Sequence, residues 1–257
     1  MTTHHTWLEQ AQKLALLLLA VISLSACAEQ FGIGGDSWKE EVLLHDGQKI
    51  VVERYQTYGG RHEIGQSPPV KEFTIVFRLP GSGKRITWTS EYGAGRTDFE
   101  LAALHIMNDT PYLVTLPNLC LSYNKWGRPI PPYVFFKYED SVWKRIALAE
   151  FPTEFKSINM VINNDGEAYA LKTQSLVSAQ QIKELNDKLR QPEYKTILRE
   201  PVNYDPSCIP MVTNGKGLWL SRERFSTRPT LEACQVECKT KKFDDNTCPC
   251  NNIFEGK

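Results

Sequence analysis

The sequence predicts a mainly β protein (α+β): an antiparallel, hairpin-rich sheet or sandwich with one helix on its C-terminal side and a small disulfide-rich appendage. Residues 41–148 contain apolar, β-branched segments in pairs, with turn residues between the members of each pair, which is typical of β-hairpins. One amphipathic segment with capping residues follows at residues 179–190, and four cysteines lie between residues 234 and 250.

The hairpins are predicted from their turns. Asp46-Gly47 is typical of a two-residue hairpin turn, and residues 80–84 and Glu139-Asp140 separate two further pairs of segments. The predicted strands are residues 41–45, 50–54, 72–79, 85–89, 112–116, 133–138 and 143–147. These hairpins favour a sandwich or a meander and are too few for a complete propeller.

Residues 98–107 allow two interpretations. Thr97-x-x-Glu100 fits a helix capping box, whereas an apolar run directly before the turn at residues 108–110 fits a strand that pairs with the next one. We favour the strand, because it completes another hairpin.

The helix at residues 179–190 has clear ends. Ser178-x-x-Gln181 forms a capping box, Val177 and Ile182 form a hydrophobic staple, and Pro192 stops the helix. A second, short helix is expected at residues 231–239.

The N-terminus predicts export. The apolar run of residues 14–26 is too short to cross a membrane, which takes about 20 residues, but it fits the apolar region of a signal peptide. Leu24-Ser25-Ala26-Cys27 is the pattern of a bacterial lipoprotein signal, in which cleavage precedes the cysteine and the thiol carries lipid. We therefore expect a signal peptide at 1–26 and a lipidated Cys27. An ordinary signal peptide with a coincidental cysteine is the alternative.

Several acyl chains on one cysteine give a stable membrane anchor. Ala28 in place of aspartate favours the outer membrane, by analogy with enterobacterial sorting, so we expect an anchored protein that faces the periplasm. Residues 27–37, rich in Gly and small polar residues, are predicted to form a tether.

Composition limits the classes of partner. The chain has 30 basic and 30 acidic residues and no polybasic stripe, so nucleic acid is not an expected partner. We expect no cofactor. The predicted organisation is a β-rich main domain at 38–202 and a cysteine-rich appendage at 203–257.

Besides Cys27 the chain has six cysteines, an even number: Cys120, Cys208, Cys234, Cys238, Cys248 and Cys250. In the oxidising periplasm this favours three disulfides. A zinc site is the competing interpretation, but the spacing lacks the usual Cys-x2-Cys pair and no histidine lies nearby. Of fifteen connectivities, we predict Cys234–Cys250 and Cys238–Cys248, nested, which leaves Cys120–Cys208.

Two Gly- and Pro-containing loops are the candidate binding sites. The first, residues 58–69, contains Arg61, His62 and Glu63. The second, residues 122–132, contains aromatic and planar polar groups that suit a sugar ring or an extended peptide: Tyr123, Asn124, Trp126 and Arg128. Loops on a rigid sheet commonly carry binding residues. In the alternative interpretation, the loop charges form structural pairs and Trp126 packs beneath its loop.

Three functional classes follow. The leading one is a non-catalytic binding or interaction module whose partner is an envelope protein or a glycan. The alternative is an envelope glycan or peptide hydrolase, with His62 and Glu63 as acid and base and Asp98 or Glu100 as a second carboxylate. The third is a structural spacer, which would tolerate change in both loops. No catalytic or metal-binding motif names an activity.

Four segments resemble a family of uncharacterised proteobacterial envelope proteins and predicted lipoproteins. They are residues 38–47 (WKEEVLLHDG), 59–66 (GGRHEIGQ), 120–138 (CLSYNKWGRP continuing to PYVFFKY) and 191–201 (QPEYKTILREP). The resemblance covers roughly residues 38–201. It implies an envelope location and one domain over this range, and it implies no activity.

Overall fold

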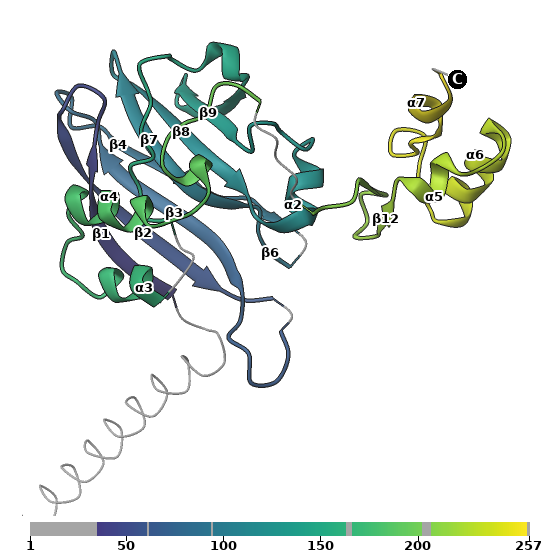
Figure 1. The fold of residues 1–257 in the computed structure, drawn as a ribbon, viewed down its shortest axis with the longest axis horizontal. Helices are drawn as coiled ribbons and strands as arrows, with labels where there is room; N and C mark the ends of the chain where they lie inside the picture. Colours follow the sequence, from purple (N-terminus) through teal and green to yellow (C-terminus); the bar gives the residue numbers. More distant parts are fainter. Residues whose placement is uncertain (1–34, 61, 94, 163–165, 202–206, 256–257) are drawn as a thin grey trace, which may run out of the picture.

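The computed structural model describes residues 35–60, 62–93, 95–162, 166–201 and 207–255. Two antiparallel four-stranded sheets pack face to face, and the C-terminal segment extends to one side of them (Figure 1). The predicted mainly β class is confirmed. The signal peptide, Cys27 and most of the tether lie outside the described residues.

Both sheets are meanders of neighbouring hairpins. The first sheet consists of β1 (Gly35–Leu43), β2 (Lys49–Tyr58), β3 (Val70–Arg78) and β4 (Arg85–Thr89), in that order. The second has the order β10-β9-β8-β7 and consists of β7 (Phe99–Met107), β8 (Thr110–Pro117), β9 (Val134–Glu139) and β10 (Val142–Ile146). A two-stranded turn of β5 (Tyr92–Gly93) and β6 (Arg96–Thr97) connects them.

Short helices surround the sheets and form most of the C-terminal part. They are α2 (Leu119–Lys125), α3 (Gly166–Lys172), α4 (Ala179–Asp187), α5 (Glu223–Ser226), α6 (Leu231–Thr240) and α7 (Cys250–Phe254). Turns of 3-10 helix lie at Leu148–Glu150 and Pro192–Tyr194. The small hairpin of β11 (Met211–Thr213) and β12 (Trp219–Ser221) leads into α5.

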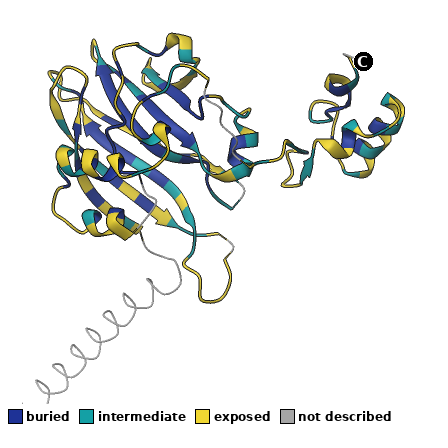
Figure 2. Cartoon of the chain, in the orientation of Figure 1, coloured by how far each residue is buried: buried dark blue, intermediate teal, exposed yellow. Residues whose placement is uncertain are grey.

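The main core lies between the sheets. Alternate residues of the first sheet point inward and are buried, so exposed and buried residues alternate along β1 and β2 (Figure 2). The second sheet is buried on both faces, because Phe151, Phe155 and Ile158 cover its far side. Burial of both faces explains why β7 reads as a continuous apolar run.

A bulge in β7 lets the strand keep its apolar residues inside. The register of β7 against β8 shifts between Leu101 and Ala103, so Leu101 and then Leu104 both pack into the core between the sheets. One extra residue reverses the alternation, which resolves the ambiguity at residues 98–107 in favour of the strand.

Several boundaries differ from those predicted. β1 begins at Gly35, because residues 35–37 pair with β2, so the strand includes the end of the predicted tether. The first turn contains three residues, not two: Leu44 N–H donates to the Gln48 carbonyl at 2.8 Å, and Gly47 takes a positive φ of 86°, as in a three-residue hairpin loop.

The predicted helix forms with its predicted cap but is shorter. Ser178 Oγ accepts a bond from Gln181 N–H at 3.3 Å, and Gln181 Oε1 accepts one from Ser178 N–H at 2.9 Å. α4 ends at Asp187, ahead of the predicted residue 190. Val177 pairs beside β1, since its N–H donates to the Lys39 carbonyl at 2.9 Å.

Candidate functional site

The first predicted loop protrudes between β2 and β3. His62 and Glu63 are exposed and line, with the residues up to Pro68, a hollow of about 440 Å³. His62 Nδ1 lies 3.1 Å from the Gly60 carbonyl oxygen. Arg61 lies outside the described residues. His62 and Glu63 therefore line the same hollow, as an acid–base pair requires. Both side chains are nevertheless exposed to solvent.

The second predicted loop is in contact with the C-terminal segment. Arg128 Nη1 donates to the Cys208 carbonyl at 2.9 Å, and Asn124 Nδ2 donates to the Ile209 carbonyl at 3.1 Å. The side-chain oxygen of Asn124 accepts a bond from Met211 N–H at 2.8 Å. Tyr123 is buried, with the Arg128 guanidinium 5.0 Å from its ring centre. These contacts favour a structural role for the three side chains.

Asp98 fixes the position of Trp126. The Asp98 carboxylate is buried and accepts bonds from Ser122 Oγ at 3.2 Å, Trp126 Nε1 at 3.2 Å and Lys125 Nζ. The Trp126 ring packs 4.6 Å from the ring of Phe99. Asp98 thus accepts bonds from three donors at α2, and these bonds hold the helix against the sheet.

All three disulfides have the predicted pairing. They join Cys120 to Cys208, Cys234 to Cys250, and Cys238 to Cys248. The first attaches the C-terminal segment to α2, and the other two lie against each other, with Cys238 Sγ 3.4 Å from Cys250 Sγ.

The sequence analysis missed a buried ionic cluster between β1 and β2. Arg54 and Glu40 are fully buried, and Arg54 Nη1 lies 3.3 Å from Glu40 Oε1. Arg54 also donates to the Val161 carbonyl at 2.8 Å, and its Nη2 lies 4.0 Å from Glu100 Oε1. The guanidinium lies 4.7 Å from the centre of the Trp38 ring.

Lys172 adds a second cation to the other side of this cluster. Its Nζ lies 4.6 Å from the Trp38 ring centre, and burial followed by the neighbouring Arg54 charge lowers the pKa of Lys172. Glu100, which was predicted as a second catalytic carboxylate, thus belongs to a buried cluster of paired charges.

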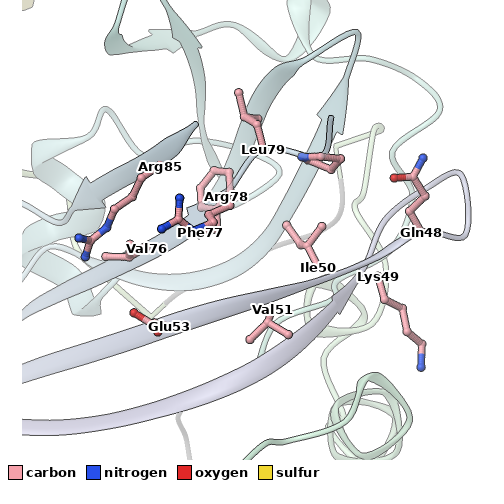
Figure 3. A pocket seen from close by; sticks show the side chains of 11 residues that line it. Gln48, Lys49, Ile50, Val51, Glu53, Val76, Phe77, Arg78, Leu79 and Arg85 are labelled. Carbon is pink, nitrogen blue, oxygen red and sulfur yellow. The ribbon is translucent and has the colours of Figure 1, made fainter. Parts of the chain in front are cut away.

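A groove opens on the first sheet where two hairpins part (Figure 3). Pairing between β2 and β3 runs from Tyr58–Val70 to Val52–Phe77, and beyond that pair the strands diverge. The groove has a volume of about 690 Å³ and is lined by residues 48–51, Glu53, residues 76–80 and Arg85.

The groove combines an apolar floor with cationic side chains. Val51, Val76, Leu79 and Pro80 supply apolar surface. Arg78 and Arg85 stand opposite each other in the register of β3 and β4, and Figure 3 shows both guanidiniums beside the groove.

The two arginines form no close ion pair among the described residues, and the Glu53 carboxylate lies near enough for the Arg85 charge to help lower its pKa. Arg78 Nη1 donates to the Gly83 carbonyl at 3.0 Å. Among the described residues, no carboxylate lies within the 4.0 Å of an ion pair from either guanidinium. Such a surface suits a ligand with both apolar and anionic groups.

The other charges at the groove have partners. Lys49 Nζ lies 3.1 Å from Glu41, and Glu53 lies 3.5 Å from Lys39 Nζ. Glu53 also accepts a bond from the Tyr55 hydroxyl at 3.0 Å. This bond, more than the nearby Lys39 and Arg85 charges, lowers the pKa of Glu53.

Comparison with known protein families, with curated proteins and with solved structures gives no match for this chain. The resemblance to the proteobacterial envelope family therefore stays a prediction. None of the helices in the described part of the chain combines the length and hydrophobicity needed to cross a membrane.

Proposed function

We propose that the protein is a lipid-anchored binding module of the bacterial envelope that captures a partner without catalysing a reaction. The groove between the diverging hairpins carries this proposal, since it joins apolar surface to Arg78 and Arg85, which form no close ion pair within the part of the chain that the structure describes. Grooves of this size with a few placed polar groups are common ligand sites.

The direction of β1 supports the proposal. A lipid on Cys27 would hold the chain at the membrane, and the eight residue steps from Cys27 to Gly35 span at most ~28 Å. β1 then runs from Gly35 to the hairpin at residues 44–48, beside the groove. The nine residues of the strand place the groove about 30 Å farther along, at the end opposite the anchor.

The anchor has a direct test. Cells grown with an alkyne-bearing fatty acid should label the wild-type protein in the outer-membrane fraction. The Cys27→Ser variant should lose the label and leave that fraction. Equal labelling of both proteins would contradict the anchor.

Binding at the groove is tested with a photo-crosslinking residue placed at Val51, in cells. Val142 on β10 is the matched control, because the two valines are 49% and 51% exposed on strands of different sheets. We expect one dominant adduct from position 51 and none from position 142. Identical adduct patterns, or no adduct from position 51, would reject the binding module.

A further inference from the structure

We propose that Cys248 is a thiol-exchange site, at which a small external thiol opens the Cys238–Cys248 disulfide and starts a second exchange that joins Cys238 to Cys250. The site takes a low-molecular-weight thiol of the glutathione class and carries it as a mixed disulfide. The reaction takes place in the C-terminal part of the chain and does not depend on binding at the groove.

Exposure directs an external thiol to one sulfur of the cluster. Cys234 and Cys250 are fully buried and Cys238 is 3% exposed, whereas Cys248 is half-buried at the border of the small apolar cluster. Thiol–disulfide exchange requires a thiolate to reach a disulfide sulfur, and the sulfur that is attacked keeps the incoming thiol. An external thiol should therefore attack Cys248 and release Cys238.

The first step is a complete exchange. The incoming thiol gives its proton to solvent, and its thiolate forms a bond to Cys248 Sγ while the bond between Cys248 and Cys238 breaks. The electron pair of the broken bond leaves with Cys238 Sγ. The products are a mixed disulfide on Cys248 and a thiolate on Cys238, and apolar surroundings disfavour such a buried thiolate.

The released thiolate lies directly beside the second disulfide. Cys238 Sγ is 3.4 Å from Cys250 Sγ, and these two sulfurs and Cys248 Sγ all lie within 4.8 Å of one another. Cys250 is bonded to Cys234. Cys238 can therefore attack Cys250 with little movement. This second exchange forms the Cys238–Cys250 bond, breaks the Cys234–Cys250 bond and leaves a thiolate on Cys234, which takes up a proton from solvent.

The main chain also holds these cysteines in place. Cys234 and Cys238 are four residues apart on α6, so they lie on the same face of the helix. Phe243 N–H donates to the Cys238 carbonyl at 2.9 Å, and Cys248 N–H donates to the Asp244 carbonyl at 2.9 Å. Loss of the Cys238–Cys248 bond therefore does not by itself release either residue.

The second exchange keeps α6 attached to α7. Before it, Cys234 on α6 is bonded to Cys250, the first residue of α7. After it, Cys238 on the same helix makes that link. The C-terminal part can thus carry a thiol on Cys248 and still keep one covalent link through its small core.

The first test treats the purified full chain with reduced glutathione for short times, quenches it with acid and maps adducts and disulfides by tandem mass spectrometry. We expect at least tenfold more glutathione on Cys248 than on Cys234, Cys238 and Cys250 together. The treated protein should also contain a Cys238–Cys250 bond, which the untreated protein lacks. The disulfide at α2, whose cysteines are also half-buried, is the positive control for the reaction.

Two serine variants test the second exchange without an external thiol, since both remove the Cys234–Cys250 disulfide. Cys234→Ser leaves Cys250 as a thiol beside Cys238. We expect Cys238–Cys250 to form there and Cys248 to become a free thiol that iodoacetamide labels in the folded protein. Cys250→Ser leaves the buried Cys234 as the free thiol, so its labelling should be at least tenfold lower. Circular dichroism establishes that both variants are folded.

Each other outcome overturns the inference. Glutathione at the α2 disulfide but not on Cys248 would reject the entry site, and equal adducts on the buried cysteines would reject control by exposure. A Cys248 adduct without any Cys238–Cys250 bond would reject the second exchange. Equal labelling of the two serine variants would show that exchange does not bring the thiol to the surface. If either variant is unfolded, the glutathione map of the wild type decides alone.

Discussion

His105 shows how burial at one residue sets a pH response. It lies fully buried on β7, where its ring stacks on Phe155 at 4.7 Å and its Nε2 lies 3.0 Å from the Ser157 carbonyl. Burial, with the neighbouring His45 in support, lowers the pKa of His105 from 6.5 to about 4. The ring is therefore neutral in the folded protein at neutral pH and donates from Nε2.

We predict that the free energy of unfolding falls as the pH falls from 6.5 to 4. In this range the unfolded chain binds a proton at His105 and the folded chain does not, so protonation favours unfolding. The full effect is roughly 3 kcal/mol. Urea unfolding at several pH values should show this slope in the wild type. The slope should be smaller in His105→Phe, and an identical slope would contradict the argument.

The Arg54–Glu40 pair should destabilise the protein more when one charge is removed than when both are, because both charges are fully buried. Arg54→Met leaves the Glu40 carboxylate without its cation, and such a loss costs about 3–5 kcal/mol. Removal of both charges in Arg54→Met with Glu40→Leu should restore much of this loss. Arg85→Met, at an exposed arginine, should change stability by only ~0.5 kcal/mol. A single Arg54→Met variant as stable as the wild type would contradict the prediction; chemical denaturation measures all three.

At the scale of elements, turn residues and alternation predict the hairpins well. The Pro-Gly-Ser-Gly-Lys turn at residues 80–84 and the capping box at Ser178 are local signals, and both form as predicted. The bulge in β7 and the short α2 depend on packing: α2 is held by Asp98, which lies between β6 and β7.

The second predicted loop shows why the sequence could indicate which residues make contacts but not what they contact. Aromatic and planar polar groups mark Asn124 and Arg128 as sites of contact, but only the fold shows that the contacts are with residues 208–211 of the same chain. One feature of the sequence could have indicated the groove. Arg78 and Arg85 flank a predicted turn symmetrically, so the hairpin register alone sets them opposite each other.

We predict that Asn124→Ala loosens the junction between α2 and the C-terminal segment. The variant loses the bonds to Ile209 and Met211, so residues 207–213 should exchange amide hydrogens at least tenfold faster, while β7 and β8 keep their protection. Hydrogen exchange with mass spectrometry measures this. Asn251→Ala, at an exposed asparagine of α7, is the control. Unchanged exchange at 207–213 would contradict a structural role for Asn124.

The described residues form three separate apolar clusters of unequal size. The sheets share a large core and a second cluster beneath residues 151–162. The C-terminal part has its own small cluster, in which three of the six buried members are cysteines: Phe225, Cys234, Cys238, Phe243, Cys250 and Ile253. So small an apolar core depends on covalent links for its stability.

We therefore predict that reduction unfolds the C-terminal part and leaves the sheets folded. A disulfide typically adds about 2–4 kcal/mol, and two of them hold α6 to the chain around α7. In dithiothreitol, hydrogen exchange should show loss of protection in α6 while β7 and β8 stay protected. Cys120→Ser with Cys208→Ser, without reductant, is the control and should leave α6 protected, because that disulfide joins α2 to the segment before α6. Loss of α6 and β7 together would make the chain one cooperative unit, and a protected α6 in reductant would show that the apolar side chains suffice.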